Sequence, residues 1–511
     1  MASTDTRPAP ATAEALHAAT PATRDRYVDL VRAAAILLVV CGHWLMAVVD
    51  WDGPVWLGNL LVILPQLQFL TWTLQVMPLF FFVGGFATLL SLQSTRLKGG
   101  GYADFLHHRA IRMLRPIGFF LALWAPLAIV LALARPASVA IQTICLIAVQ
   151  PLWFIAAYLL VVGITPLTLA LHRRWGAAVP AILCGIVVVV DAVRFQLDLF
   201  AVGAINFLAV WILAYQLGYF YADGRLQKIR RGWLVAVAIG GVALLIALTT
   251  YGPYPRSLVG LPSDRFSNMF PPTLCIGVLV ILLVAVALLL REPLTRLTQR
   301  PRVWALVVGV NMVIMTIFLW HLTAFSLAIS ALHALGISLP EPGSTAWVLT
   351  LPLWFGCLAA VLFGLVRLFG PVETAPLPSR PIVGPSKPRA ILGVVGLLYV
   401  IVGILLLAYS GLASLVSGDA VPLFGFVADA LVALIRLGLG AALIRAAASA
   451  SMRRAATVIA ALLVALAGVE ALLPSAAGGP GDAVVHAATA LIVAAALAAT
   501  ARRGHLTHVH L

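Results

Sequence analysis

The stretch Val31-Arg-Ala-Ala-Ala-Ile-Leu-Leu-Val-Val-Cys-Gly-His43-Trp-Leu-Met-Ala-Val-Val49 decides the class of fold. It is about as long as a helix must be to cross ~30 Å of hydrocarbon, and its two basic side chains are Arg32 and His43. A helix advances about 100° per residue, so these two residues share one face, about 16 Å apart along the axis. The stretch therefore predicts a transmembrane helix that carries a cation and an imidazole on the same side.

Arg32 and His43 have two interpretations. Ionisable groups inside a membrane usually face a protein interior or a wet cavity and mark a working site, and imidazole is well suited to moving a proton near neutral pH. Alternatively, Arg32 reaches the headgroups and pairs with Asp29 one turn earlier, while His43 makes a structural hydrogen bond between helices. This helix alone leaves both interpretations open.

The composition predicts an all-α polytopic membrane protein. The 511 residues are 62% hydrophobic and 10% charged, whereas soluble domains are about 45–50% apolar and about 25% charged. Long continuous apolar runs favour helices over a barrel, whose strands alternate. The net charge of +15 is spread over the short segments between these runs, which argues against nucleic-acid binding. The five cysteines all lie in apolar runs without paired spacing, so we expect neither disulfides nor a metal site.

Fourteen spans are expected from the apolar runs. Their approximate limits are 31–49, 76–93, 117–134, 151–171, 176–193, 205–221, 233–250, 273–290, 303–331, 346–366, 390–410, 425–446, 455–473 and 484–501. Lysine and arginine collect in alternate connections, which places both termini in the cytoplasm. Segment 51–75 is too polar for a confident span and is interpreted as an interfacial or re-entrant segment.

A proline-rich break divides the chain. Its prolines are incompatible with a continuous helix and predict a semi-extended linker. The expected parts are a disordered cytoplasmic tail (1–25), a ten-span membrane domain (26–369), the cytoplasmic linker (370–389), a four-span C-terminal module of unknown role (390–501) and a cytoplasmic tail (502–511). We expect the ten-span domain to hold the chemistry. In the C-terminal module, Asp429 and Arg436 lie two turns apart on one face and are expected to pair with each other or with a neighbour.

Five segments resemble, in the same order, those of the acyltransferase 3 family of membrane-bound acyltransferases, over about residues 24–369. The segments are Arg32 and His43 with ten residues between them, the aromatic run Pro78–Phe86, Arg112 and Arg115 at the third span, Trp153-Phe154-Ile155 with Tyr158, and Phe318-Leu-Trp-His321. Arg109 with Arg112 also fits the third pattern. The chain departs from the family at Gly84, where the family has serine, and in its additional four-span module.

The resemblance implies an enzyme that moves an acyl group, often acetyl, from cytoplasmic acyl-CoA to a hydroxyl of an envelope carbohydrate or glycolipid. It implies an inner or plasma membrane location and acyl-CoA as donor, with acetyl-CoA the expected form. The implied site residues are His43 as catalytic base or acyl relay, Arg32, Arg112 and Arg115 on the CoA phosphates, and Trp153, Tyr158 and His321 in the substrate cavity. By themselves, the three arginines on one stripe also fit the ordinary excess of cytoplasmic positive charge.

Two other classes of protein fit the same features. A secondary transporter or exporter of a small or lipid-linked substrate would also have many spans and a few intramembrane charges, although the chain has no internal repeat. A non-catalytic membrane scaffold would use Arg32 and His43 only for packing. Loss of acyl transfer without loss of folding in a His43 variant separates the enzyme from both.

Overall fold

The computed structural model describes residues 12–50, 56–135, 138–262, 264–377, 381–417, 421–423, 426–472 and 480–508. These residues are almost entirely helical, and fourteen of the helical segments are long and apolar enough to cross a membrane. The predicted all-α polytopic class is therefore confirmed, and so is the expected number of spans.

The chain divides into two compact units, each assembled from segments that are distant in sequence. Unit 1 contains Met1–Met46, Asn59–Phe86 and Leu171–Phe318, and unit 2 contains Ala47–Gly58, Ala87–Ala170 and Leu319–Leu511. Three of the unit boundaries fall inside helices, so α5 (Met77–Leu97), α9 (Thr165–Trp175) and α16 (Ile314–Ala334) contribute residues to both units.

Unit 1 also contains the N-terminal helices, three short elements before α5, and the helices between α9 and α16. They are α1 (Ala13–Ala18), α2 (Arg26–Met46), α3 (Leu60–Ile63), η1 (Pro65–Leu70), α4 (Thr71–Leu74), α10 (Ala178–Gln196), η2 (Phe200–Gly203), α11 (Ala204–Ala222), η3 (Leu226–Lys228), α12 (Arg231–Tyr251), α13 (Leu274–Leu289), α14 (Arg291–Leu297) and α15 (Pro301–Met312). Helix α1 lies within the segment 1–25, which was expected to be a disordered tail. It packs against α15.

Helices α5 and α11 cross so closely in unit 1 that glycine is required at the contact. A Cβ atom on Gly85 would lie 2.1 Å from the carbonyl oxygen of Tyr215, and one on Gly218 would lie 2.1 Å from that of Phe82. Small residues at such crossings let two backbones meet. Gly85 in the aromatic run at 78–86 therefore has a packing role, which sequence reasoning had not assigned.

Unit 2 also contains the remaining helices and two small hairpins. Its elements are β1 (Ala47–Asp50), β2 (Trp56–Asn59), α6 (Tyr102–Ala134), α7 (Val139–Val149), α8 (Leu152–Gly163), α17 (Thr345–Thr374), α18 (Lys387–Ser410), α19 (Ser414–Ser417), β3 (Val421–Leu423), β4 (Phe426–Ala428), α20 (Ala430–Ala447), α21 (Met452–Leu472) and α23 (Pro480–His508). Strand β1 pairs with β2, and β3 pairs antiparallel with β4.

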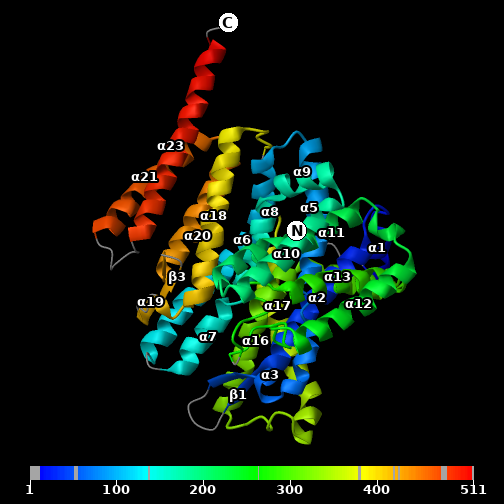
Figure 1. The fold of residues 1–511 in the computed structure, drawn as a ribbon. Coiled ribbons are helices and arrows are strands. Elements are labelled where there is room, and N and C mark those ends of the chain that lie inside the picture. Colours follow the sequence, from blue (N-terminus) through cyan, green and yellow to red (C-terminus); the bar gives the residue numbers. More distant parts are fainter. Residues whose placement is uncertain are drawn as a thin grey trace, which may run out of the picture. The chain divides into compact units, whose positions relative to one another are not determined.

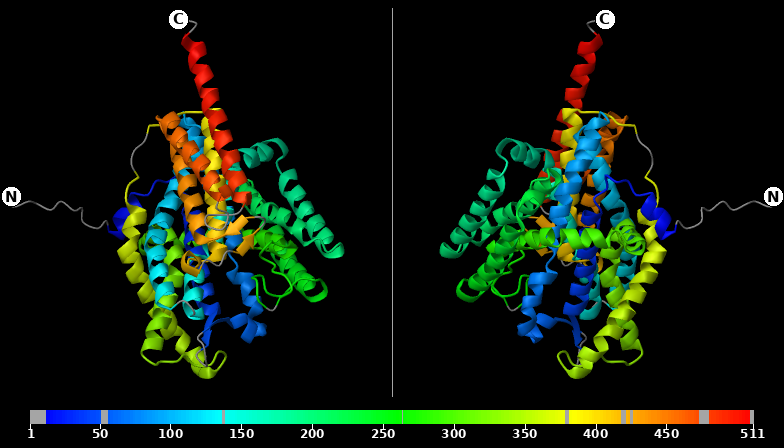
Figure 2. Two further views of the ribbon diagram at one scale, coloured as in Figure 1. Left: turned by 90° about the vertical axis from the view of Figure 1, so that its left-hand side faces the viewer. Right: turned by 90° about the vertical axis from the view of Figure 1, so that its right-hand side faces the viewer.

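The C-terminal helices form a tightly packed layer in unit 2. Helix α18 packs along α20 and also against α8 and α6, while α21 packs against α23 (Figure 1; Figure 2). Glycines again permit the closest approach, because a Cβ atom on Gly440 would lie 2.6 Å from the carbonyl oxygen of Gly396. The C-terminal module therefore shares a packed interior with α6 and α8.

Several expected limits differ from the observed ones for local reasons. The expected span 151–171 is replaced by α7 and α8, which together form a candidate span from Val139 to Gly163 and are separated at Pro151. Proline lacks an amide donor and is favoured where a helix begins. The expected span 303–331 is broken at Val313 between α15 and α16, and segment 51–75 forms short elements in its described part. Helix α17 continues to Thr374, so the non-helical part of the linker begins at Ala375.

Candidate functional site

Arg32 lies on α2 in unit 1 and is held by two polar neighbours. Its Nε donates to Asn311 Oδ1 on α15, and its Nη2 lies 3.4 Å from Asp29 Oδ1. Asn311 also donates to the backbone oxygen of Asp29 at 2.8 Å, so α15 fixes the start of α2. The Arg32 side chain is 34% exposed. The pairing with Asp29 is the one expected from the structural interpretation of Arg32, and the partial exposure of the side chain is what the functional interpretation needs.

His43 lies near the other end of α2. Its side chain is exposed, whereas the adjacent Gly42 and Trp44 are buried. Arg32 and His43 belong to the same unit and the same helix, as the sequence predicted. The accessible surface of the His43 side chain is what a proton acceptor for a substrate hydroxyl requires.

The three arginines of α6 have different environments in unit 2. Arg109 donates through Nη2 to Thr88 Oγ1 on α5, and Arg112 is exposed. Arg115 donates to the backbone oxygens of Ala375 at 2.6 Å and Glu373 at 2.9 Å. Arg115 therefore satisfies carbonyl groups at the end of α17, a role that the sequence did not predict. A cation is stabilised near the C-terminal end of a helix, because that end carries a partial negative charge.

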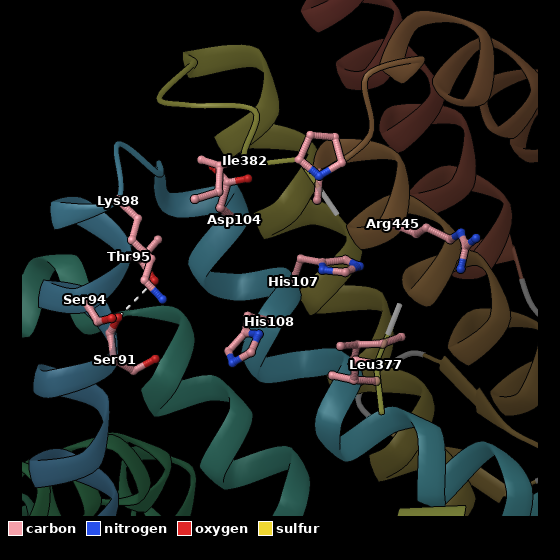
Figure 3. A pocket seen from close by; sticks show the side chains of 13 residues that line it. Ser91, Ser94, Thr95, Lys98, Asp104, His107, His108, Leu377, Ile382 and Arg445 are labelled. Carbon is pink, nitrogen blue, oxygen red and sulfur yellow. Dashed lines mark hydrogen bonds between the residues drawn. The ribbon is translucent and has the colours of Figure 1, made fainter. Parts of the chain in front are cut away.

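A pocket of about 460 Å³ lies beside the start of α6 (Figure 3). Helix α5 contributes three hydroxyl side chains, Lys98 directly follows α5, α6 contributes two histidines, and α20 contributes Arg445. The polar lining consists of Ser91, Ser94, Thr95, Lys98, Asp104, His107, His108 and Arg445. Its size is within the usual range for a small-molecule site.

Asp104 adds a carboxylate to this basic lining, and both of its oxygens accept hydrogen bonds from backbone N–H groups. Its Oδ2 accepts from the backbone N–H of Gly101 at 2.8 Å, and its Oδ1 accepts from that of Val383 at 3.1 Å. The carboxylate thus joins the start of α6 to the linker. Lys98 and Arg445, together with the hydroxyl groups of Ser91 and Ser94, are an arrangement suited to an anion such as phosphate, whereas the Thr95 hydroxyl already donates to the Ser91 carbonyl oxygen at 2.9 Å.

The remaining predicted site residues lie elsewhere in unit 2. Trp153 and Tyr158 are half-buried on α8, and Tyr158 lies 6.3 Å from Phe154 between ring centroids. His321 is fully buried on α16. None of these three residues lines the pocket, and Arg112 and Arg115 do not line it either.

Next to His321, the aromatic rings of three helices form a cluster. Trp320 stacks on Phe369 at 4.1 Å and meets Phe120 edge-on at 5.1 Å. Trp124 donates to Thr323 Oγ1 at 3.1 Å. The segment Phe318–His321 thus packs α16 against α6 and α17.

Sequence reasoning missed the contribution of Lys98, His107 and Arg445 to one pocket. The local signals were present, since all three belong to basic stretches at helix ends. Arg445 lies outside the domain expected to hold the chemistry, and only the fold brings it to α5 and α6.

Sequence reasoning also missed buried His172, which bridges Gln216 and Asp223 of the α11 region at 3.0 Å each. Among the residues that the structure describes, no three His, Cys, Asp or Glu side chains are grouped to hold a metal ion.

The loop between α12 and α13 contains the titratable groups with altered pKa outside the spans. Burial raises the pKa of Tyr254, whose hydroxyl donates to Asp191 Oδ2 at 3.0 Å. Burial also raises the pKa of the Asp264 carboxyl. The contacts of Tyr254 anchor this loop to α10.

Comparison with known proteins gives one match. The model of the family described as "Acyltransferase domain" matches residues 25–369, which is most of the chain. No curated protein and no solved structure matches it. The matched region coincides with the ten-span domain and includes each of the five segments quoted from the sequence. The chain therefore belongs to the acyltransferase 3 family, and is an acyltransferase of the membrane.

Proposed function

We propose that this protein transfers an acyl group, with acetyl as the expected group, from cytoplasmic acyl-CoA to a hydroxyl of an envelope carbohydrate or glycolipid. Membership of the family supports acyl transfer, and the fourteen apolar helices support a membrane location. The donor, the acceptor and the inner or plasma membrane as the site of action are parts of the proposal.

The observation that carries the donor assignment is the basic pocket beside α6. Lys98 and Arg445 supply fixed positive charge, and the α5 hydroxyl groups supply hydrogen-bond donors. CoA carries several phosphate groups and a long, narrow pantetheine arm. A pocket that holds the phosphates at the basic ends of the helices would leave this arm free to extend toward the membrane interior.

His43 is the proposed base or acyl relay. As base, its imidazole takes the proton of the acceptor hydroxyl while the oxygen attacks the thioester carbonyl, and the thiol leaves with one proton. As relay, it forms an acyl-imidazole that the hydroxyl then cleaves. Its exposure on α2 supports either role.

Arg32, Arg112 and Arg115 remain proposed donor-binding residues. Arg112 is exposed and Arg32 is partly exposed, so both can meet a phosphate without losing a packed position. Arg115 is engaged with α17, so its proposed contribution includes positioning the segment that leads into the pocket.

Donor binding tests the pocket directly. We expect Lys98→Ala and Arg445→Ala each to weaken the binding of a non-hydrolysable acyl-CoA by about tenfold, because a hydrogen bond to a charged group contributes about 1.5–3 kcal/mol. The measurement is equilibrium binding to the purified full chain in lipid nanodiscs. Arg174→Ala, which removes an exposed arginine of α9 outside the pocket, is the matched control.

Unchanged affinity in both pocket variants would contradict the donor site. Saturable transport of a substrate into vesicles, without any acylated product, would favour the transporter instead.

A further inference from the structure

The C-terminal module encloses a cluster of ionisable side chains that the proposed acyl transfer does not use. We name it the buried cluster, and its members are Tyr399, Arg436, Glu470, Asp482 and His486. They come from α18, α20, α21 and α23, and none is more than 4% exposed. Charged groups within membrane spans are costly and by default mark a functional site.

Two ion pairs are embedded in this cluster. Arg436 Nη2 donates to Asp482 Oδ1, and His486 Nδ1 lies 2.7 Å from Glu470 Oε2. The Tyr399 ring connects the pairs, with its centroid 5.8 Å from the Arg436 guanidinium carbon and 5.6 Å from the His486 ring centroid. Arg436 was expected to pair with Asp429 or with a neighbour, and its partner is the neighbour Asp482 on α23. Asp429 instead accepts from two backbone N–H groups at the start of α20.

The charges of the cluster leave room for one exchangeable proton. The positive charge of Arg436 and the negative charge of Asp482 cancel. Glu470 and His486 cancel only when they hold one acidic proton between them, either on the carboxyl group or on the second ring nitrogen. Without that proton the cluster carries a net negative charge inside a region of low dielectric constant, which is unfavourable. The neutral, protonated form and the anionic form therefore differ by a single proton.

His486 provides the atom at which that proton would arrive. Its ring is fully buried, and Nε2 has no hydrogen-bond partner among the residues that the structure describes. A buried polar atom without a partner is uncommon, because no hydrogen bond offsets the free-energy cost of removing it from water. A proton can reach such an atom through a small rearrangement, whereas side chains this buried give no access to a larger ligand.

We propose that the C-terminal module exchanges a proton at the Glu470–His486 pair. In the anionic form, neutral His486 donates through Nδ1 to the Glu470 carboxylate. A proton from water then bonds to the Nε2 lone pair, and the Nδ1 proton passes to Glu470. The products are a carboxylic acid and a neutral imidazole that is protonated at Nε2. One proton enters and the net charge rises by one.

This activity is separate from the proposed acyl transfer. In that reaction the proton lost by the acceptor hydroxyl leaves with the thiol of CoA, so the transfer neither consumes nor releases a net proton. A buried proton site in the C-terminal module therefore indicates an additional, proton-linked step. It also stands if acyl transfer fails its own test.

Infrared difference spectroscopy of the full chain in lipid bilayers tests the proposal. Spectra are compared between about pH 5.5 and about pH 9, where exposed carboxyl groups stay ionised. Selective ¹³C labels are placed on the glutamate carboxyls in one sample and on the histidine rings in another. The chain has five glutamates, Glu14, Glu292, Glu341, Glu373 and Glu470, and only Glu470 is buried.

We expect a labelled carboxyl or imidazole signal that changes over this range. The signal should disappear in Glu470→Gln or His486→Gln, and it should persist in His333→Gln, which alters an exposed histidine of α16. Absence of any labelled glutamate or histidine signal attributable to the pair would show that the proton is fixed and would overturn the proposal. The glutamate label in the unaltered chain gives this answer even if a variant fails to fold.

Discussion

Arg32 with His43 on α2, and the buried cluster of the C-terminal module, place charges in membrane spans in opposite ways. Arg32 is partly exposed and His43 is exposed, whereas Arg436, Asp482, Glu470 and His486 are at most 1% exposed and are paired with one another. Exposed groups can contact a substrate, whereas enclosed ion pairs can exchange only a species as small as a proton. The exposure of an intramembrane charge therefore indicates the size of the ligand that it can serve.

Breaking an enclosed pair should have the largest effect on stability. Asp482→Ala leaves Arg436 buried without its carboxylate, and we expect a loss of about 3–5 kcal/mol in unfolding free energy. Asp29→Ala removes the partly exposed ion pairs of this carboxylate with Arg24 and Arg32, and should cost no more than about 1 kcal/mol for each pair. Denaturant unfolding of the full chain in mild detergent measures both.

A double variant sharpens this test. Arg436→Met combined with Asp482→Leu removes both charges, and we expect it to recover most of the stability lost in Asp482→Ala. Equal losses in Asp29→Ala and Asp482→Ala would show that enclosure makes no difference, and the comparison would fail.

Sequence spacing predicted contacts within one helix and failed for contacts between helices. Asp29 and Arg32 are three residues apart, so one turn of helix brings them together. Asn311, the second partner of Arg32, is 279 residues away, and Asp482 is 46 residues from Arg436. Such partners depend on helix packing, which apolar periodicity does not specify.

The pocket illustrates the same limit. The three arginines of α6 form a plausible phosphate stripe in the sequence, but in unit 2 they have three environments. Arg445 reaches the pocket because α18 and α20 pack along α6 and α8, partly through the Gly396–Gly440 crossing. The number of spans and the family could be predicted from the sequence, whereas the composition of the pocket required the fold.

Arg115→Lys should have an intermediate effect. Nη2 donates to the carbonyl oxygens of Ala375 and Glu373 at 2.6 and 2.9 Å, and Nη1 donates to that of Pro376 at 3.4 Å, so two nitrogens of one planar group reach three carbonyls, which a single ammonium cannot span. We expect a loss of about 1 kcal/mol in stability and a severalfold weaker affinity for a non-hydrolysable acyl-CoA. A normal affinity with reduced stability would restrict Arg115 to holding α17.

The smallest effect is expected at Asp264 in the loop before α13. Burial raises the pKa of this carboxyl, so the folded protein binds its proton more tightly than the unfolded chain does. Stability from this group is present below the unfolded pKa and is lost as the pH rises through the folded pKa. Asp264→Asn should therefore raise the melting temperature slightly at neutral pH and leave it unchanged in acid. A rise at both pH values would contradict this cause.

The most direct test of the account is acyl transfer by His43→Ala. Membranes containing the unaltered or the altered chain at equal amounts are given acetyl-CoA labelled in its acetyl group, and label is counted in the glycan and glycolipid fractions. We predict transfer by the unaltered chain and a loss of about 10²–10⁴-fold in the variant, the usual contribution of a general base, with donor affinity retained. Undiminished transfer by a correctly inserted His43→Ala protein would contradict the central claim.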